Sequence, residues 1–188
     1  MASLVLSGDT SGTVTVSAPA VAGSNTQTLV AETGTLAPIV SGTAVASTSG
    51  TSIDFTGIPS WVKRITVMLS GVSTSGTSLL LVRLGTSAGI ETSGYASTGA
   101  TPAGTVVSNT SGALVVIVGA AAANINTSMI FNKVDGNSWV ENHVVNAGSS
   151  AHYAATSKTL SDTLTQVRIT TVNGTDTFDA GTINILYE

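Results

Sequence analysis

Cysteine is absent from this chain of 188 residues, charged side chains make up 9% of it, and aromatic side chains make up 4%. Without cysteine there can be no disulfide, thiolate nucleophile or cysteine-ligated zinc site. The six basic residues are scattered, and Lys63-Arg64 is their single adjacent pair. Binding of nucleic acid needs clustered positive charge. We therefore expect no cofactor, no catalytic residues and no nucleic-acid partner.

Long apolar runs are also missing. The longest run, Ala113–Ala123, is shorter than the roughly 20 residues that a membrane-spanning helix needs. The amino-terminal stretch has no basic segment and Asp9 interrupts its apolar residues, unlike a secretory signal peptide. We expect no insertion into a membrane, and a protein that reaches the cell exterior by lysis, not by secretion.

The residues that are abundant favour β-structure. Hydrophobic residues make up 42% of the chain, and much of the rest is Thr, Ser and Gly. β-branched side chains pack well on a pleated surface, and no stretch has apolar residues at helical spacing. Short β-prone runs with regular turns are typical of a sandwich or barrel. We predict an all-β fold: an antiparallel β-sandwich, jelly-roll-like, preceded by an extended N-terminal anchor arm.

The predicted arm covers residues 1–40 and the predicted sandwich covers residues 41–188. The arm contains short β-prone pieces at 4–6, 13–16 and 26–30, and no aromatic residue. Such pieces cannot bury their own apolar side chains. We expect the arm to become ordered against a partner, the alternative being a disordered tail. The predicted anchoring residues are Leu4, Leu6, Val14, Val16, Val21 and Leu29.

Turn signals divide the second part into short predicted strands. These cover residues 52–55, 62–69, 79–84, 92–96, 114–118, 128–134, 138–145, 151–158, 166–172 and 182–187. The strongest signal is Asp135-Gly136-Asn137 between two β-prone runs, which predicts a hairpin with a type I′ turn. We expect the final strand to lie inside a sheet.

The two histidines are the first candidates for a binding site. Glu141 stands two residues before His143, and a strand would place both on one face, where they could meet a ligand. The alternative, which we favour, is a solvated strand face. A metal site needs three or four convergent ligands, and no third ligand is evident. Asp176, Asp179 and Asn173 could offer oxygens to calcium, but Asp and Asn are also ordinary turn residues.

Aromatic residues are the candidates for glycan binding, because a sugar ring stacks on an exposed aromatic face. Tyr95 lies in a Ser/Thr/Gly-rich stretch and Trp139 follows the predicted hairpin turn, so these two are the candidate glycan contacts. The alternative, which we favour, is that both pack in the core. Trp61, directly after Pro59-Ser60, is expected to cap the core.

Two parts of the chain resemble known phage proteins. Ser7–Leu36, reading SGDTSGTVTVSAPAVAGSNTQTLVAETGTL, resembles an N-terminal segment of tail-fibre and other virion structural proteins of tailed bacteriophages. Ser49–Ser78 and Val167–Glu188 resemble a β-domain that ends many such proteins. The resemblance implies a fibre or a head-associated spike, commonly a homotrimer, whose N-terminal part docks onto the particle. The resemblance implies no catalytic residues.

The leading hypothesis is therefore a virion structural protein, a short trimeric tail fibre. Its partners would be further copies of itself and other virion proteins, such as a tail adaptor or a capsid protein. One alternative is a capsid decoration protein or head fibre. Another is a carbohydrate-binding adhesion module that contacts a host surface glycan. In the first two cases the protein is located in the virion.

Overall fold

The computed structural model describes residues 3–7, 10–17, 33–34 and 37–188. It divides into two compact units, Met1–Leu36 and Ala37–Glu188. Within the described ranges every regular element is a strand, so no helix there could cross a membrane. The division falls before the predicted boundary at residue 40, because Val40 and Ser41 already pair with the last strand of the second unit.

The first unit contains one antiparallel hairpin, β1 (Ser3–Ser7) with β2 (Thr13–Ser17). Both strands match β-prone pieces of the predicted arm. The hairpin forms a sheet of its own and adds no strand to the sheets of the second unit. The piece predicted at 26–30 lies outside the described residues.

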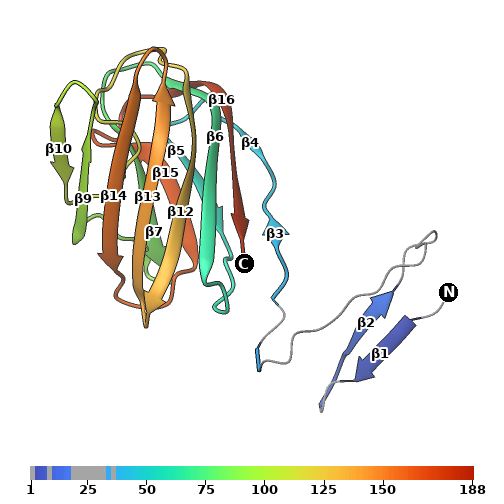
Figure 1. Cartoon of the computed structure of the whole chain (residues 1–188). Coiled ribbons are helices and arrows are strands. Elements are labelled where there is room, and N and C mark those ends of the chain that lie inside the picture. Colours follow the sequence, from blue (N-terminus) through green and yellow to red (C-terminus); the bar gives the residue numbers. More distant parts are fainter. Residues whose placement is uncertain (1–2, 8–9, 18–32, 35–36) are drawn as a thin grey trace. The chain divides into compact units, whose positions relative to one another are not determined.

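The second unit has a larger and a smaller sheet, which lie one behind the other in Figure 1. The large sheet contains β3 (Val40–Ser41), β4 (Val45–Ala46), β6 (Arg64–Thr74), β9 (Tyr95–Ala100), β10 (Val106–Asn109), β12 (Ile125–Asp135), β13 (Ser138–Ala147), β14 (Ala151–Thr159) and β16 (Phe178–Tyr187). The small sheet contains β5 (Ser52–Thr56), β7 (Leu80–Thr86), β8 (Gly89–Ile90), β11 (Ala113–Leu114) and β15 (Gln166–Thr171).

Strand order shows which elements are neighbours. The large sheet runs β10-β9-β14-β13-β12-β6-β16-β3, with β4 also on β16, and the small sheet runs β11-β7-β15-β5, with β8 on β7. All these pairings are antiparallel. The last long strand, β16, lies between β6 and the short strands β3 and β4, as expected for a final strand inside the sheet.

Apolar side chains from both sheets form one core between them. Ile53, Val82 and Ile169 come from the small sheet, and Ile65 and Phe131 come from the large sheet. Alternate residues of a strand point to opposite faces. A strand whose sequence alternates between apolar and polar residues can therefore direct all its apolar side chains into this core. The predicted all-β sandwich is confirmed.

The segment that follows β11 covers a part of the large sheet by itself. The sequence predicts a strand over 114–118, but only Ala113 and Leu114 pair with a neighbour, β7. Residues 115–117 are buried without belonging to a strand. Leu114 and Ile117 pack with Ala154 of β14 in a second, smaller apolar cluster. An irregular buried segment thus covers this part of the large sheet, where the sequence predicts a strand.

The Asp-Gly-Asn signal marks the hairpin between β12 and β13, and that prediction is confirmed. The turn type differs from the predicted one. Gly136 has a φ of +49°, whereas Asn137 is not among the described residues with positive φ. A type I′ turn needs positive φ at both central positions, while a type II′ turn needs it only at the first. The turn therefore has the φ pattern of type II′.

Candidate functional site

The β1–β2 hairpin presents an apolar face to solvent. Leu4 pairs with Val16, and Leu6 pairs with Val14, so these four side chains share one face of the ribbon. Their exposed fractions lie between 54% and 64%. All four are predicted anchoring residues; the other two, Val21 and Leu29, lie outside the described residues.

An exposed two-stranded ribbon has two means of binding another protein. A single hairpin is at best marginally stable in water, and its apolar face gains free energy when a partner covers it. Its outer backbone groups can also extend the edge of a partner sheet. The hairpin therefore offers both an apolar face and the backbone groups of its outer edges to another surface.

Glu141 and His143 project into the protein. They share one face of β13, as predicted, but that face is buried and both side chains have no exposed area. The expected solvated face is therefore wrong. Nδ1 of His143 lies 2.6 Å from Oε1 of Glu141, and its Nε2 lies 3.0 Å from the carbonyl oxygen of Val115.

These contacts determine where the protons of the His143–Glu141 pair lie. A carbonyl oxygen can only accept, so Nε2 of His143 carries a hydrogen and donates it to Val115. A second proton must then lie between Nδ1 and the Glu141 carboxylate, since two lone pairs would repel each other at 2.6 Å. The pair therefore has no net charge. Its imidazole nitrogens are both occupied by protein atoms, which leaves none for a metal.

Other polar groups continue this inward face across β14 and β9. Nδ1 of His152 accepts the N–H of Ile117 at 3.2 Å, and burial lowers the pKa of this imidazole. Oγ of Ser97 accepts hydrogen bonds from the Leu114 N–H and from the Thr156 hydroxyl, at 3.0 and 2.9 Å. The segment after β11 therefore binds the large sheet through backbone groups as well as through apolar contacts.

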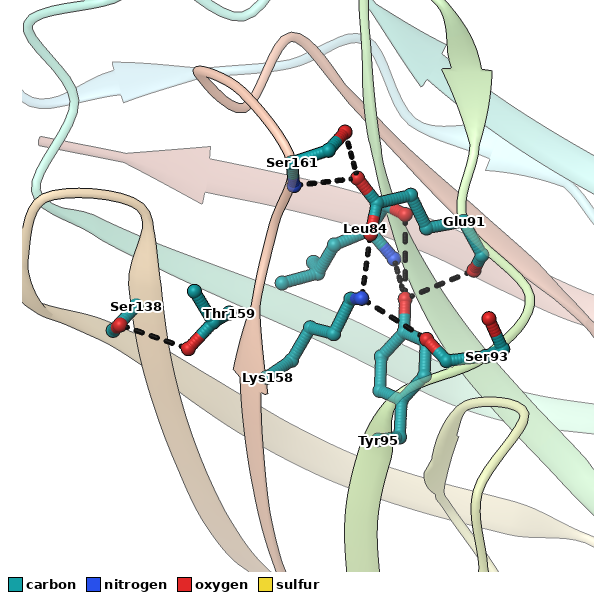
Figure 2. Close-up of polar contacts among 8 residues, drawn as sticks. All are labelled: Leu84, Glu91, Ser93, Tyr95, Ser138, Lys158, Thr159 and Ser161. Atoms are coloured by element: carbon teal, nitrogen blue, oxygen red, sulfur yellow. Dashed lines mark hydrogen bonds and ion pairs between the residues drawn. The ribbon is translucent and has the colours of Figure 1, made fainter.

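Lys158 connects the end of β14 to the segment between β8 and β9 (Figure 2). Its Nζ lies 2.5 Å from Oε2 of Glu91, donates to the Ser93 carbonyl at 2.9 Å, and lies 5.2 Å from the centre of the Tyr95 ring. Oε1 of Glu91 accepts from the amide and hydroxyl of Ser161. Burial would raise the pKa of Glu91, but the hydrogen bonds from Lys158 and Ser161 outweigh it and lower that pKa.

The Tyr95 hydroxyl joins the two sheets within this cluster. It accepts the N–H of Leu84 in β7 at 2.7 Å and lies 3.2 Å from the carbonyl oxygens of Leu84 and Glu91, to which it can donate. Burial raises the pKa of this hydroxyl well above its usual range, so it remains protonated. We name Tyr95, Lys158, Glu91 and Ser161 the clasp. Every polar atom in it serves another protein atom, which is typical of a structural element.

The two candidate glycan contacts, Tyr95 and Trp139, both pack in the core, which is the interpretation that the sequence favoured. Tyr95 is 2% exposed and Trp139 is 3% exposed, so neither ring offers a face to a sugar. Trp61, expected to cap the core, is 39% exposed, with its ring centre 6.0 Å from that of Tyr187. Tyr153 is 51% exposed. Tyr95 pairs with Lys158 of β14, which points inward, whereas Tyr153 of β14 points outward. The two tyrosines therefore lie on opposite faces of the large sheet.

The described residues contain no group of three or more His, Asp or Glu side chains that could hold a metal ion. Asn173 donates to Asp176 at 2.7 Å, and Asp176 also accepts the N–H of Ser78. These hydrogen bonds lower the pKa of Asp176. Asp179 instead accepts from the Ser73 hydroxyl. The two carboxylates thus hold turns and strand ends together, which matches the turn interpretation.

The buried polar groups were not identifiable from the sequence. Glu141, His143, Thr156 and Lys158 stand at alternate positions, but the residues between them are also small or polar. Contacts with distant residues decide which face is covered: Val115 lies on His143, and Glu91, Ser93 and Tyr95 lie on Lys158. No protein-family model, curated protein or solved structure matches the chain.

Proposed function

We propose that this chain is a structural protein of a phage particle, a short tail fibre that attaches through its N-terminal arm and works as a homotrimer. The observation that carries the proposal is the exposed apolar face of the β1–β2 hairpin. We propose a phage particle as the partner of the hairpin because Ser7–Leu36 resembles N-terminal segments of phage structural proteins. The trimer is what the same resemblance implies.

The second unit supports a projecting role. Its core is continuous between two sheets and contains no residue of the hairpin. Its buried titratable groups hold one another or the backbone. Such a unit can remain folded at the surface of a particle while the arm makes the attachment.

Attachment can be tested with charges placed on the apolar face of the hairpin. Leu6→Asp with Val14→Asp should reduce incorporation into particles strongly, because two buried, unpaired carboxylates oppose docking. Quantitative immunoblotting of purified particles measures incorporation. The matched control is Thr15→Asp, whose side chain lies on the opposite face of the hairpin.

Normal incorporation of the double variant would refute attachment through this face. A version lacking residues 1–36 gives a second measurement, since it should fold and remain outside the particle. Electron microscopy of labelled particles then separates a tail fibre from a head decoration protein. Label on the capsid would favour the decoration alternative.

A further inference from the structure

The strands β9, β14 and β13 are neighbours in the large sheet (Figure 1). Their outward-facing residues carry no charge. Buried and exposed residues alternate along all three strands. The charged residues of these strands, Glu141 and Lys158, point inward. The outward residues are Ala, Ser, Thr, Asn, Val and Tyr. A face without charge avoids the large cost of burying an unpaired ion when another surface covers it, and its hydroxyl and amide groups can form hydrogen bonds across the contact.

This face has protruding residues next to a hollow. Val106, Ala100, Tyr153 and Val144 form one row across four strands, and three of them are 51–68% exposed. The next row, Thr98, Ala155 and Asn142, belongs to the lining of a hollow. Tyr153 and Ala155 are two residues apart on β14 and point to the same face, so their Cα atoms lie about 7 Å apart.

We propose that this outer face is the contact between copies of the chain, with Tyr153 of one copy seated in the hollow over Ala155 of another. In a ring of three copies, each Tyr153 would enter the hollow of the next copy. The inference rests on the proposed function for the existence of an oligomer and identifies the surface that forms it.

Charge is the reason that the occupant is a second copy. The chain has a net charge of −4, so two copies repel each other wherever their carboxylates come close. The small sheet carries Asp54, Arg83 and Arg168 in one cross-strand row, and Arg83 opposite Arg168 is already a like-charge pair. The three uncharged strands can meet their own copies without opposing like charges.

The test measures the mass of the full chain in solution by light scattering during size exclusion. The wild type should have the mass of two or more chains. Val144→Lys and Ala155→Arg should each raise the apparent dissociation constant at least about 100-fold, because a charge would be buried without a partner. Val144 is 68% exposed in the single chain, so lysine there should leave folding intact.

The matched control is Val118→Lys. Val118 is also an exposed valine, at 50%, but it lies in the connection between β11 and β12 and outside the proposed contact. It should keep the wild-type mass. Circular dichroism and thermal unfolding of all variants exclude misfolding as the cause of dissociation.

A single-chain mass for the wild type overturns the inference, as does an oligomer whose mass both face variants leave unchanged. An oligomer that is lost when residues 1–36 are removed also overturns it, because the hairpin would then make the contact. Failure of the inference is distinguishable from failure of the proposed function. Particle incorporation depends on the hairpin variants, whereas solution mass depends on Val144 and Ala155.

Discussion

At the scale of single residues, the sandwich contains polar groups where apolar ones would be expected. Glu141 and His143 are the clearest case, because both are fully buried and their charges are balanced only by each other. A buried pair of this kind contributes little net stability, but removal of one partner leaves the other without compensation. The consequence can be measured.

His143→Leu should lower the free energy of unfolding by about 3–5 kcal/mol, because Glu141 stays buried without its partner. The double variant His143→Leu with Glu141→Leu should regain most of that loss. Asp54→Asn, which breaks the partly exposed pair with Arg168, should cost less than about 1 kcal/mol. Urea denaturation measures all three; a double variant as unstable as the single one would contradict this account.

His152 should make stability depend on pH. Its pKa in the folded protein is lowered by burial, below the unfolded value of about 6.5. Below that pH the unfolded chain binds more protons than the folded one, so the free energy of unfolding falls as the pH decreases toward the folded pKa. His152→Asn keeps an acceptor for Ile117 and should reduce this slope. Urea denaturation at several pH values between about 7.5 and 5 measures the free energy of unfolding of the wild type and of His152→Asn. The same dependence of that free energy on pH in both proteins would contradict the prediction.

At the scale of elements, the clasp connects strands of different sheets. Tyr95 begins β9 in the large sheet, and its hydroxyl contacts the backbone of β7 in the small sheet. Lys158 and Glu91 join the end of β14 to the segment after β8. Sheet packing alone would permit some sliding, and these hydrogen bonds determine how the two layers align at this end.

Tyr95→Phe should lower the free energy of unfolding by about 1–3 kcal/mol, because the buried N–H of Leu84 loses its acceptor. Tyr153→Phe, measured at protein concentrations where the chain is a single copy, is the matched control, since that ring is then half exposed, and it should change stability by less than about 0.5 kcal/mol. Thermal and urea unfolding of both variants provide the measurement. Equal effects of the two substitutions would show that the clasp hydroxyl has no structural role.

At the scale of the whole molecule, the core and the apolar hairpin belong to different units. Removal of residues 1–36 should shift the thermal midpoint of unfolding by no more than about 2 °C, because none of the described residues in this range belongs to the core. Differential scanning calorimetry of residues 37–188 against the full chain tests this. A large decrease would mean that the hairpin contributes to the stability of the sandwich.

The sequence predicted the elements well where side chains alternate clearly. The strand that ends in Ile183, Ile185 and Tyr187 and the hairpin at Gly136 follow from apolar alternation and turn chemistry. The prediction was wrong at residues 114–118, because an apolar run does not distinguish a strand from a buried irregular segment. Core packing of Tyr95 and Trp139 was the favoured prediction and both are buried, but the sequence left glycan contact open because their neighbours are too uniformly small and polar to mark an inward face.

Composition and local pattern alone determined that this protein is all-β, lacks cysteine chemistry and has an apolar amino-terminal part. These properties depend on residue type and on contacts between near neighbours. Only the tertiary structure decided that Glu141, His143 and Lys158 point inward and that the outer face of β9, β14 and β13 has no charge. The physical reason is that one face of a strand becomes interior only when a distant segment lies on it, here residues 113–117 at His143 and the residues Glu91, Ser93 and Tyr95 at Lys158.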